Sequence, residues 1–367
     1  MSATPMIQLK SVRKRYPGAD ADAVAHLDLT IDEGEIVVLV GPSGCGKTTT
    51  LRMINRLAEP TSGSIVVAGR AIDSMPPHEL RRTIGYVIQQ IGLFPHRSIA
   101  QNIATVPALL GWDKHRTDAR VIELADLVDI DRSMLARYPS ELSGGQRQRV
   151  GVARALAADP PVLLMDEPFG AVDPIVRERL QRELLSLQQR LQKTIVLVTH
   201  DIDEAILVGD RVAILNTGGI LEQYATPAEI LTSPANSFVA GFLGSDRGIK
   251  RLSLLTIETH MIEDGPVVFH DTPTSEASDV MDRHALDWAI VVAEGRIEGS
   301  VSKSGLNGDT IAQSRMEVLD SVIERSATLK DALDVIISTN GRCAAVTEGG
   351  RYVGVITTAG ISQRISQ

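Results

Sequence analysis

The stretch that decides the fold is GPSGCGKTT, Gly41–Thr49. It follows the short apolar run EIVVLVG and leads into the helix-compatible GKTTTLRMINRL. The stretch fits G-x-x-x-x-G-K-[ST], in the strand-then-helix setting that makes this pattern informative. Its glycines let successive backbone N–H groups point at phosphate oxygens, and the helix start adds partial positive charge. We therefore predict a phosphate-binding loop rather than a glycine-rich turn without a ligand.

The side chains of this loop favour ATP with Mg²⁺. Lys47 is expected to reach the β- and γ-phosphates, and Thr48 to place its hydroxyl on the metal. The residues expected to contact the nucleotide are Gly41, Ser43, Gly44, Gly46, Lys47, Thr48 and Thr49.

A second motif, VLLMDEP (Val162–Pro168), ends an apolar strand in two carboxylates. Asp166 is suited to hold Mg²⁺, directly or through water. Glu167, one residue further, is suited to act as the general base for the attacking water. Downstream of a phosphate-binding loop, this acidic pair predicts a nucleotide-hydrolysing site.

The first two-thirds of the chain alternates apolar runs with helical stretches. PVLLMDEP and TIVLVTHD read as buried parallel strands, and IVRERLQRELLSLQQRLQ has the leucine spacing of an amphipathic helix. RVAILNTGGILEQYAT predicts a hairpin with its turn at 216–219. The pattern predicts an α/β domain with a mostly parallel core sheet.

The bulk composition bounds the class of protein. A length of 367 residues favours two domains. A net charge of -9 and 3% aromatic residues argue against a nucleic-acid-wrapping surface and against stacking platforms. The two cysteines, Cys45 and Cys343, exclude a disulfide framework and a four-cysteine metal site. Since no apolar run is long enough to span a bilayer and the N-terminus lacks a signal-peptide core, the chain is expected to remain in the cytoplasm.

The C-terminal region contains an internal repeat. With an offset of 55 positions, Pro273–Leu306 matches Thr328–Ile361 without a gap, with three glycines in register. Each copy reads as a helix, a β run, a glycine turn and a second β run, and two such units can bury each other's apolar faces. Chance similarity between two hairpins is the alternative. We predict an ATPase domain at 1–245, a connector at 246–271 and a paired repeat at 272–367, with copies at 272–310 and 327–367.

Four motifs in fixed order resemble the ATP-binding subunit of an ABC transporter: GPSGCGKT, LSGGQ (Leu142–Gln146), LLMDEP and THD (Thr199–Asp201). The resemblance covers about 7–245 and implies a P-loop ABC ATPase with an antiparallel β subdomain and a helical subdomain. It also implies that two copies pack head to tail around two ATP molecules. The residues that would cover the nucleotide of the other copy are Ser143, Gly144, Gly145 and Gln146.

Four further residues take their roles from this resemblance. Tyr16 resembles the aromatic that stacks on adenine, with a lone surface tyrosine as the alternative. Gln89 resembles the glutamine that reaches the metal and the water, and its neighbour Gln90 is an alternative register. Asp173 resembles the residue that links the two sites across the dimer, and His200 the histidine that contacts the γ-phosphate.

The stretches YVIQQIGLFPHRSIAQNIATVP and MINRLAEPTSG are similar to those of importers for quaternary-ammonium osmoprotectants such as glycine betaine, choline and carnitine. This resemblance implies transmembrane permease subunits as partners, an extracytoplasmic substrate-binding protein as an indirect one, and a place on the cytoplasmic side of the membrane. An importer of another small solute, an amino acid or a sugar, is the nearest alternative. A soluble ABC ATPase acting on ribosomes or DNA and a ligand sensor with a vestigial ATPase are more distant ones.

In the same family, paired C-terminal repeats are cystathionine-β-synthase (CBS) domains, so we expect a small α+β tandem CBS-like domain. The nucleotide-binding CBS pattern ends in an aspartate that grips a ribose, but Gly305 and Gly360 stand at that place here. Adenosine nucleotides are therefore disfavoured, and a cyclic dinucleotide at a dimer interface stays open. From residue 249 onward, 11 Lys and Arg face 17 Asp and Glu, which disfavours a cationic membrane-sensing face. A dimerisation module and a regulatory switch both remain.

Overall fold

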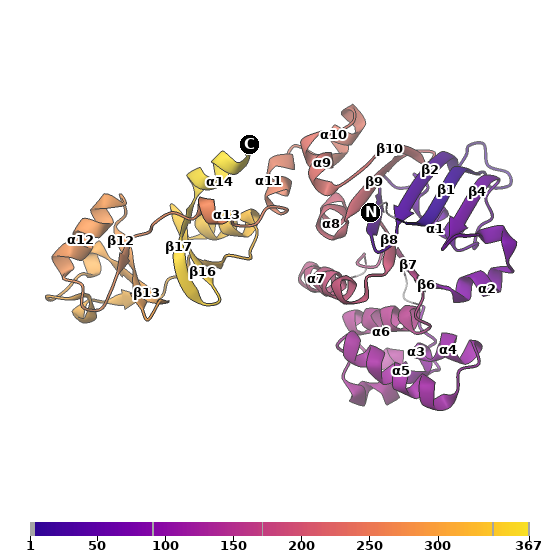
Figure 1. Cartoon of the computed structure of the whole chain (residues 1–367), viewed down its shortest axis with the longest axis horizontal. Coiled ribbons are helices and arrows are strands. Elements are labelled where there is room, and N and C mark those ends of the chain that lie inside the picture. The colour runs from indigo at the N-terminus through magenta and orange to yellow at the C-terminus, as the bar shows by residue number, and fades with distance from the viewer. Residues whose placement is uncertain (1–3, 90–91, 171, 340, 366–367) are drawn as a thin grey trace. The chain divides into compact units, whose positions relative to one another are not determined.

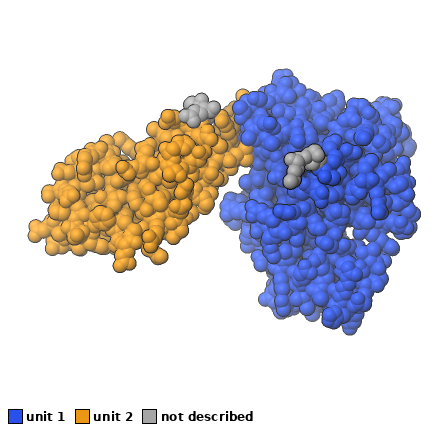
Figure 2. Space-filling view, in the orientation of Figure 1, with its two compact units in different colours: residues 1–244 blue, residues 245–367 orange. Residues whose placement is uncertain are grey.

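The computed structural model describes residues 4–89, 92–170, 172–339 and 341–365. The chain forms two compact units, Met1–Gly244 and Ser245–Gln367, which are coloured separately in Figure 2. In the described part of the chain, no helix has the length and apolar character needed to cross a bilayer.

The first unit is built on a six-stranded sheet in the order β10-β9-β3-β8-β7-β6. The five strands from β9 to β6 run parallel to one another, and β10 pairs antiparallel with β9 at the edge through a hairpin. The strands are β3 (Ile36–Val40), β6 (Ile84–Val87), β7 (Val162–Asp166), β8 (Thr194–Thr199), β9 (Arg211–Asn216) and β10 (Ile220–Ala225). Because β3, β7 and β8 are buried along their full length, their continuous apolar runs fit a central position. The predicted, mostly parallel core sheet is confirmed.

A second, four-stranded sheet in the order β2-β1-β4-β5 forms the antiparallel subdomain (Figure 1). Its strands are β1 (Pro5–Lys14), β2 (Val24–Asp32), β4 (Ser62–Val67) and β5 (Arg70–Ala71). Helix α1 (Lys47–Ile54) shares one apolar core with both sheets, which includes Ile7, Leu51 and Val196. The helix that follows the phosphate-binding loop is therefore fixed between the two sheets.

The remaining helices of this unit connect and cover the sheets. The helical subdomain contains α3 (Ile99–Ile103), α4 (Thr105–Leu109), α5 (Lys114–Leu127) and α6 (Gly144–Leu156), drawn in magenta in Figure 1. The others are α2 (Pro77–Arg82), α7 (Pro174–Leu191), α8 (Ile202–Val208), α9 (Pro227–Thr232) and α10 (Ser237–Leu243). The antiparallel and helical subdomains implied by the resemblance are both present.

The second unit contains two copies of one helix-and-hairpin pattern. The first copy is β11 (Val267–Val268), α12 (Thr274–Arg283), β12 (Trp288–Ala293) and β13 (Arg296–Ser302). The second is β15 (Val322–Glu324), α13 (Leu329–Ser338), β16 (Cys343–Glu348) and β17 (Arg351–Thr357), and α14 (Thr358–Ile365) follows it. Both helices and both hairpins keep the 55-residue offset of the sequence repeat. A buried cluster combines Ile290 and Val292 with Cys343, Ala345 and Val355, so the two copies share a core.

The stretch 246–271, predicted as a connector, is folded into this second unit. It contains α11 (Arg247–Leu252), a turn of 3-10 helix at Thr259–Met261 and strand β11. Leu252, Ile257 and Met261 are buried in the core of the second copy. The polar, glycine-containing start of the stretch suggested a linker, but its apolar residues are used to cover the repeat.

Candidate nucleotide site

The phosphate-binding loop joins β3 to α1 at the carboxyl edge of the parallel sheet. Its glycines are required by the backbone and by close neighbours. Gly46 has φ +97, and a Cβ there would lie 2.5 Å from the carbonyl oxygen of Ala23. A Cβ on Gly41 would lie 2.1 Å from the carbonyl oxygen of Leu215. Only glycine fits at both positions, so the curled loop is built into the fold rather than formed around a ligand.

Lys47 is the buried cation of this loop, at 6% exposure. Its Nζ donates hydrogen bonds to the carbonyl oxygens of Gly41 at 2.7 Å and Pro42 at 3.0 Å. These acceptors belong to the loop itself, so the ammonium group lies against the loop that leads into the start of α1. An anionic phosphate is the ligand that such a combination favours.

Asp166 and Thr48 form the oxygen-rich part of the site. The Thr48 hydroxyl donates to Asp166 Oδ1 at 2.9 Å. Asp166 is 5% exposed, and burial raises the pKa of its carboxyl group. Tyr86 on β6 lies beside it, and burial raises the pKa of its phenol to about 12. A buried carboxylate and a hydroxyl are hard oxygen ligands that fit Mg²⁺, although the described residues hold no cluster of three His, Cys, Asp or Glu side chains able to bind a metal by themselves.

Glu167 is held by two other predicted catalytic residues. Gln89 Nε2 donates to Glu167 Oε2 at 2.7 Å, and His200 Nδ1 lies 3.4 Å from Glu167 Oε1. The backbone of Glu167 has φ +45, a left-handed conformation that costs a non-glycine residue about 1 kcal/mol. Its N–H donates to the carbonyl oxygen of Val198 at 2.9 Å, which fixes this turn to β8. The alternative residue Gln90 lies outside the described residues.

Two of the expected contact residues lie at the margin of this cluster. Tyr16 is 39% exposed, and its hydroxyl is 3.5 Å from Thr49 Oγ1 on α1. The Lys14 ammonium lies 4.9 Å from the centre of the Tyr16 ring. Asp173 caps α7, where its carboxylate accepts from the N–H of Val176 at 3.1 Å. Ser43 and Gly44 are exposed at the top of the loop.

The LSGGQ motif opens α6 with a capping box. Ser143 Oγ accepts from the Gln146 N–H at 3.3 Å, and Gln146 Oε1 accepts from the Ser143 N–H at 2.8 Å. Leu142 is buried and anchors the turn, whereas Ser143 is exposed. A Cβ on Gly144 would meet nothing within 4 Å, and one on Gly145 only Val176 at 3.4 Å. Packing against the described residues therefore does not require glycine at either position.

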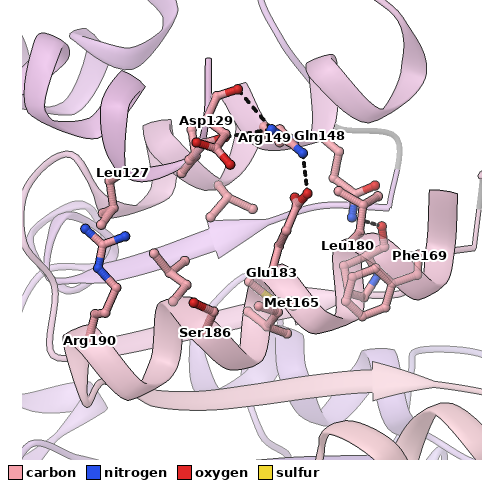
Figure 3. A pocket seen from close by; sticks show the side chains of 15 residues that line it. Leu127, Asp129, Gln148, Arg149, Met165, Phe169, Leu180, Glu183, Ser186 and Arg190 are labelled. Atoms are coloured by element: carbon pink, nitrogen blue, oxygen red, sulfur yellow. Dashed lines mark hydrogen bonds and ion pairs between the residues drawn. The ribbon is translucent and has the colours of Figure 1, made fainter. Parts of the chain in front are cut away.

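Helix α6 is tied to the segment that follows the acidic pair (Figure 3). The Gln148 amide donates to the carbonyl oxygen of Pro168, next to Glu167. Arg149 donates to the carbonyl oxygen of Asp129 at 2.9 Å and pairs with Glu183 on α7. These side chains line a mostly apolar cavity of about 150 Å³ between α6 and α7. Helix α6 is therefore attached to the backbone that positions Glu167.

Tyr86 and Gln148 are the site residues that the sequence analysis missed. Tyr86 stands in an ordinary strand pattern, which carries no signal for its contact with Asp166. For Gln148 the sequence does contain a signal, because this residue shares a helix face with Gly151 and Ala155, and both of these are buried. A polar residue on the apolar face of a helix needs a partner, and that partner is Pro168.

Comparison with known proteins agrees with this geometry. The family profile described as "ABC transporter" matches residues 24–170. The chain is 46% identical to the osmoprotectant import ATP-binding protein OsmV of Salmonella typhimurium, over 98% of this chain and 96% of the relative. It is 45% identical to the glycine betaine/carnitine/choline transport ATP-binding protein OpuCA of Bacillus subtilis, over 97% and 95%. The choline transport protein OpuBA of the same organism is 44% identical, over 97% and 95%.

Solved structures match the first unit. A dimeric ATP-binding cassette in a post-hydrolysis state, bound to ADP and phosphate, has a TM-score of 0.54 and 34% identity, covering 60% of this chain and 99% of that one. The cassette cbiO1 of Clostridium perfringens, described as part of an ABC transporter complex, has a TM-score of 0.58 and 25% identity, covering 68% and 99%. Both likenesses confirm the predicted ABC ATPase fold.

Proposed function

Because this chain belongs to the family of ABC transporter ATP-binding proteins, and its nearly full-length relatives serve osmoprotectant import, we propose that it powers an importer for quaternary-ammonium osmoprotectants. The chain is an ABC-type ATPase that binds ATP. Glycine betaine, choline and carnitine are the cargo named for the relatives, and their similarity extends through the second unit. An importer of another small solute remains the alternative.

The observation that carries the proposal is Glu167, held between Gln89 and His200 beside the Thr48–Asp166 pair. Lys47 binds the β- and γ-phosphates. Glu167 accepts a proton as the water oxygen forms its bond to the γ-phosphorus and the bond to the β,γ-bridging oxygen breaks, which yields ADP and phosphate.

His200 and Gln89 orient Glu167 and the water. Mg²⁺ would be held by Thr48, Gln89 and Asp166, and it would neutralise charge on the phosphate oxygens. Tyr16 would stack on the adenine ring, with the exposed Ser43 and Gly44 at the loop surface beside the phosphates.

The open start of α6 supports a site completed by a second copy of this chain. Residues 143–146 would cover the γ-phosphate held by the partner's loop, and Asp173 would connect the two sites. The similar cassette solved with ADP and phosphate is dimeric. Hydrolysis would then require the closed dimer, and opening it would release the products.

The chain would act on the cytoplasmic side of the membrane, against transmembrane permease subunits that receive cargo from an extracytoplasmic binding protein. The cargo would be selected by those partners and not by this chain. The second unit would serve as a CBS-like regulatory or dimerisation module.

Uptake of labelled glycine betaine in high-salt medium tests the proposal. A host that lacks this chain would be complemented with the wild type or with Glu167→Gln. Uptake restored by the wild type alone is the expected result, and competition by choline and carnitine ranks the cargo. If purified protein hydrolyses ATP but neither form restores uptake, the cargo assignment is wrong and the ATPase assignment stands.

A further inference from the structure

Helices α7 and α8 are joined by a buried polar pair that the proposed mechanism does not use. Gln181 on α7 and Glu204 on α8 are each 6% exposed, and Gln181 Nε2 donates to Glu204 Oε1 at 3.2 Å. We propose that Gln181 and Glu204 are positioning residues for ATP hydrolysis, which hold His200 in place against Glu167. The inference deepens the proposed function, because it rests on the role assigned there to His200.

Glu204 is connected to the residues on both sides of His200. Its N–H donates to Asp201 Oδ1 at 3.3 Å, and the Asp201 N–H donates to the Thr199 hydroxyl at 3.1 Å. Burial raises the pKa of the Glu204 carboxyl group, and hydrogen bonding from Thr199 and Gln181 partly offsets this rise. Thr199 is 2% exposed, so these contacts lie inside the fold. The backbone that carries His200 is thus fixed from Thr199 to Glu204.

A second contact joins the same two helices nearer the surface. Arg177, one turn before Gln181 on α7, lies 3.8 Å from the Asp201 carboxylate, and both side chains are about one-third exposed. Its guanidinium also donates to the carbonyl oxygen of Val172 at 3.5 Å. Residues four apart on α7 therefore face residues three apart on α8, as neighbours on one side of each helix. Two contacts together oppose rotation of the loop that precedes α8.

The other end of this connection is the residue expected to link the two sites of the dimer. Asp173 caps α7, so it stands at the start of the helix that carries Gln181. His200 Nδ1 lies 3.4 Å from Glu167 Oε1. A shift of α7 would act on His200 through the buried pair. A displacement of about 1 Å in an active site is enough to slow a reaction about 100-fold.

A pair that only stabilises the fold is the alternative, and α7 supplies a matched control. Gln188 is also a buried glutamine of this helix, at 9% exposure, and its Nε2 donates to the carbonyl oxygens of Gly34 at 2.7 Å and Lys193 at 2.5 Å. Gly34 precedes β3, at the edge of the sheet opposite the nucleotide site. Removing either glutamine takes a buried hydrogen bond from α7, but only Gln181 is bonded to α8.

Single-turnover ATP hydrolysis by the full chain, measured beside equilibrium binding of a fluorescent ATP analogue, tests the proposal. Gln181→Leu should slow hydrolysis about tenfold and leave ATP affinity within about threefold, because the phosphate-binding loop keeps its own contacts. Gln188→Leu should lower the melting temperature about as much as Gln181→Leu, by about 3–8 °C. Its hydrolysis rate should nevertheless stay within about twofold of wild type.

Glu204→Gln is the conservative replacement at the other residue of the pair. Its amide oxygen can still accept from Gln181, and the amide is neutral, which is the form that burial favours for the carboxyl group. Hydrolysis should stay within about threefold of wild type. Glu204→Leu keeps a similar volume but removes the acceptor, and it should slow hydrolysis about tenfold.

Equal loss of hydrolysis in Gln181→Leu and Gln188→Leu, or equal loss in Glu204→Gln and Glu204→Leu, would overturn the proposal. Wild-type rates in Gln181→Leu would do the same. If the buried variants do not fold, Arg177→Leu at the half-exposed contact should slow hydrolysis about threefold, and an unchanged rate there would also overturn it.

Glu167→Gln in the same assay separates this inference from the proposed function. Hydrolysis by Glu167→Gln at the wild-type rate would contradict the catalytic assignment itself. If Glu167→Gln is inactive and Gln181→Leu is unimpaired, only the positioning role is wrong.

Discussion

Two glycine-rich helix starts in the first unit differ in how complete they are. At the start of α1, a Cβ on Gly41 or Gly46 would clash with backbone, and Lys47 is buried over the loop. At the start of α6, Ser143 is exposed and a Cβ on Gly144 would meet nothing. The first start is complete within one chain. The second has the glycines of a phosphate site, but a Cβ on Gly144 would meet no other described residue, as the proposed completion of the site by a second copy requires.

Removing the cation of the complete start should have the largest effect. Lys47→Ala is expected to weaken ATP binding about 100-fold and to reduce hydrolysis about 1,000-fold or more, because no other buried cation faces the phosphates in the described site. Binding of a fluorescent ATP analogue and steady-state phosphate release measure the two effects. Cys45→Ala, within the same loop, should stay within about threefold of wild type in both. Similar losses in both variants would mean that any substitution in this loop disrupts its structure, and would not assign a specific role to Lys47.

Glu167→Gln should separate chemistry from binding at the complete start. Gln89 and His200 hold the carboxylate, and loss of a general base slows the chemical step by about 100- to 10,000-fold. ATP affinity should remain within about threefold, since the substitution leaves Lys47 and Thr48 in place. Single-turnover hydrolysis measured beside equilibrium binding checks this. Hydrolysis by the variant at the wild-type rate would show that Glu167 is not the general base.

Gln148→Leu tests the connection between the open start and the catalytic turn. The substitution leaves the Pro168 carbonyl without its donor, which should lower the free energy of unfolding by about 1–3 kcal/mol. Hydrolysis should fall about tenfold, because the turn that carries Glu167 loses its attachment to α6. Urea denaturation and phosphate release measure the two effects. Gln189→Leu, on the exposed face of α7, is the control and should change neither quantity.

Asp166→Asn should give the smallest effect and a stabilising one in the absence of nucleotide. Burial raises the pKa of Asp166, so its charged form is disfavoured in the folded state and stability is lost as pH rises above its ordinary value near 3.8. The variant should therefore melt about 1–3 °C higher than wild type at pH 7, with a smaller difference near pH 4. Thermal melts at both pH values check this. A difference that is larger at pH 4 would reverse the assigned sign.

Much of the first unit could be predicted because its motifs stand at strand ends. Parallel strands place their carboxyl ends on one edge, so the loop after β3, the acidic pair at the end of β7 and His200 after β8 lie at the same edge of the sheet. Tyr86 and Gln148 were missed because their roles depend on a neighbour that is distant in sequence. Within the stretch predicted as a connector, Leu252, Ile257 and Met261 are buried in the core of the second copy, a role that their scattered positions in the sequence do not reveal.

The most direct test of the central claim, that the start of α6 acts on another molecule's nucleotide, is ATP binding and single-turnover hydrolysis by Ser143→Arg. The Ser143 side chain is exposed, and its hydroxyl accepts a hydrogen bond from Gln146 in its own helix start. Because this contact does not involve the Lys47 loop, ATP affinity should stay within about threefold. Hydrolysis should fall at least about 100-fold, because a bulky cation at this position blocks closure over the partner's γ-phosphate. Parallel loss of binding and hydrolysis, or unchanged hydrolysis, would contradict the account.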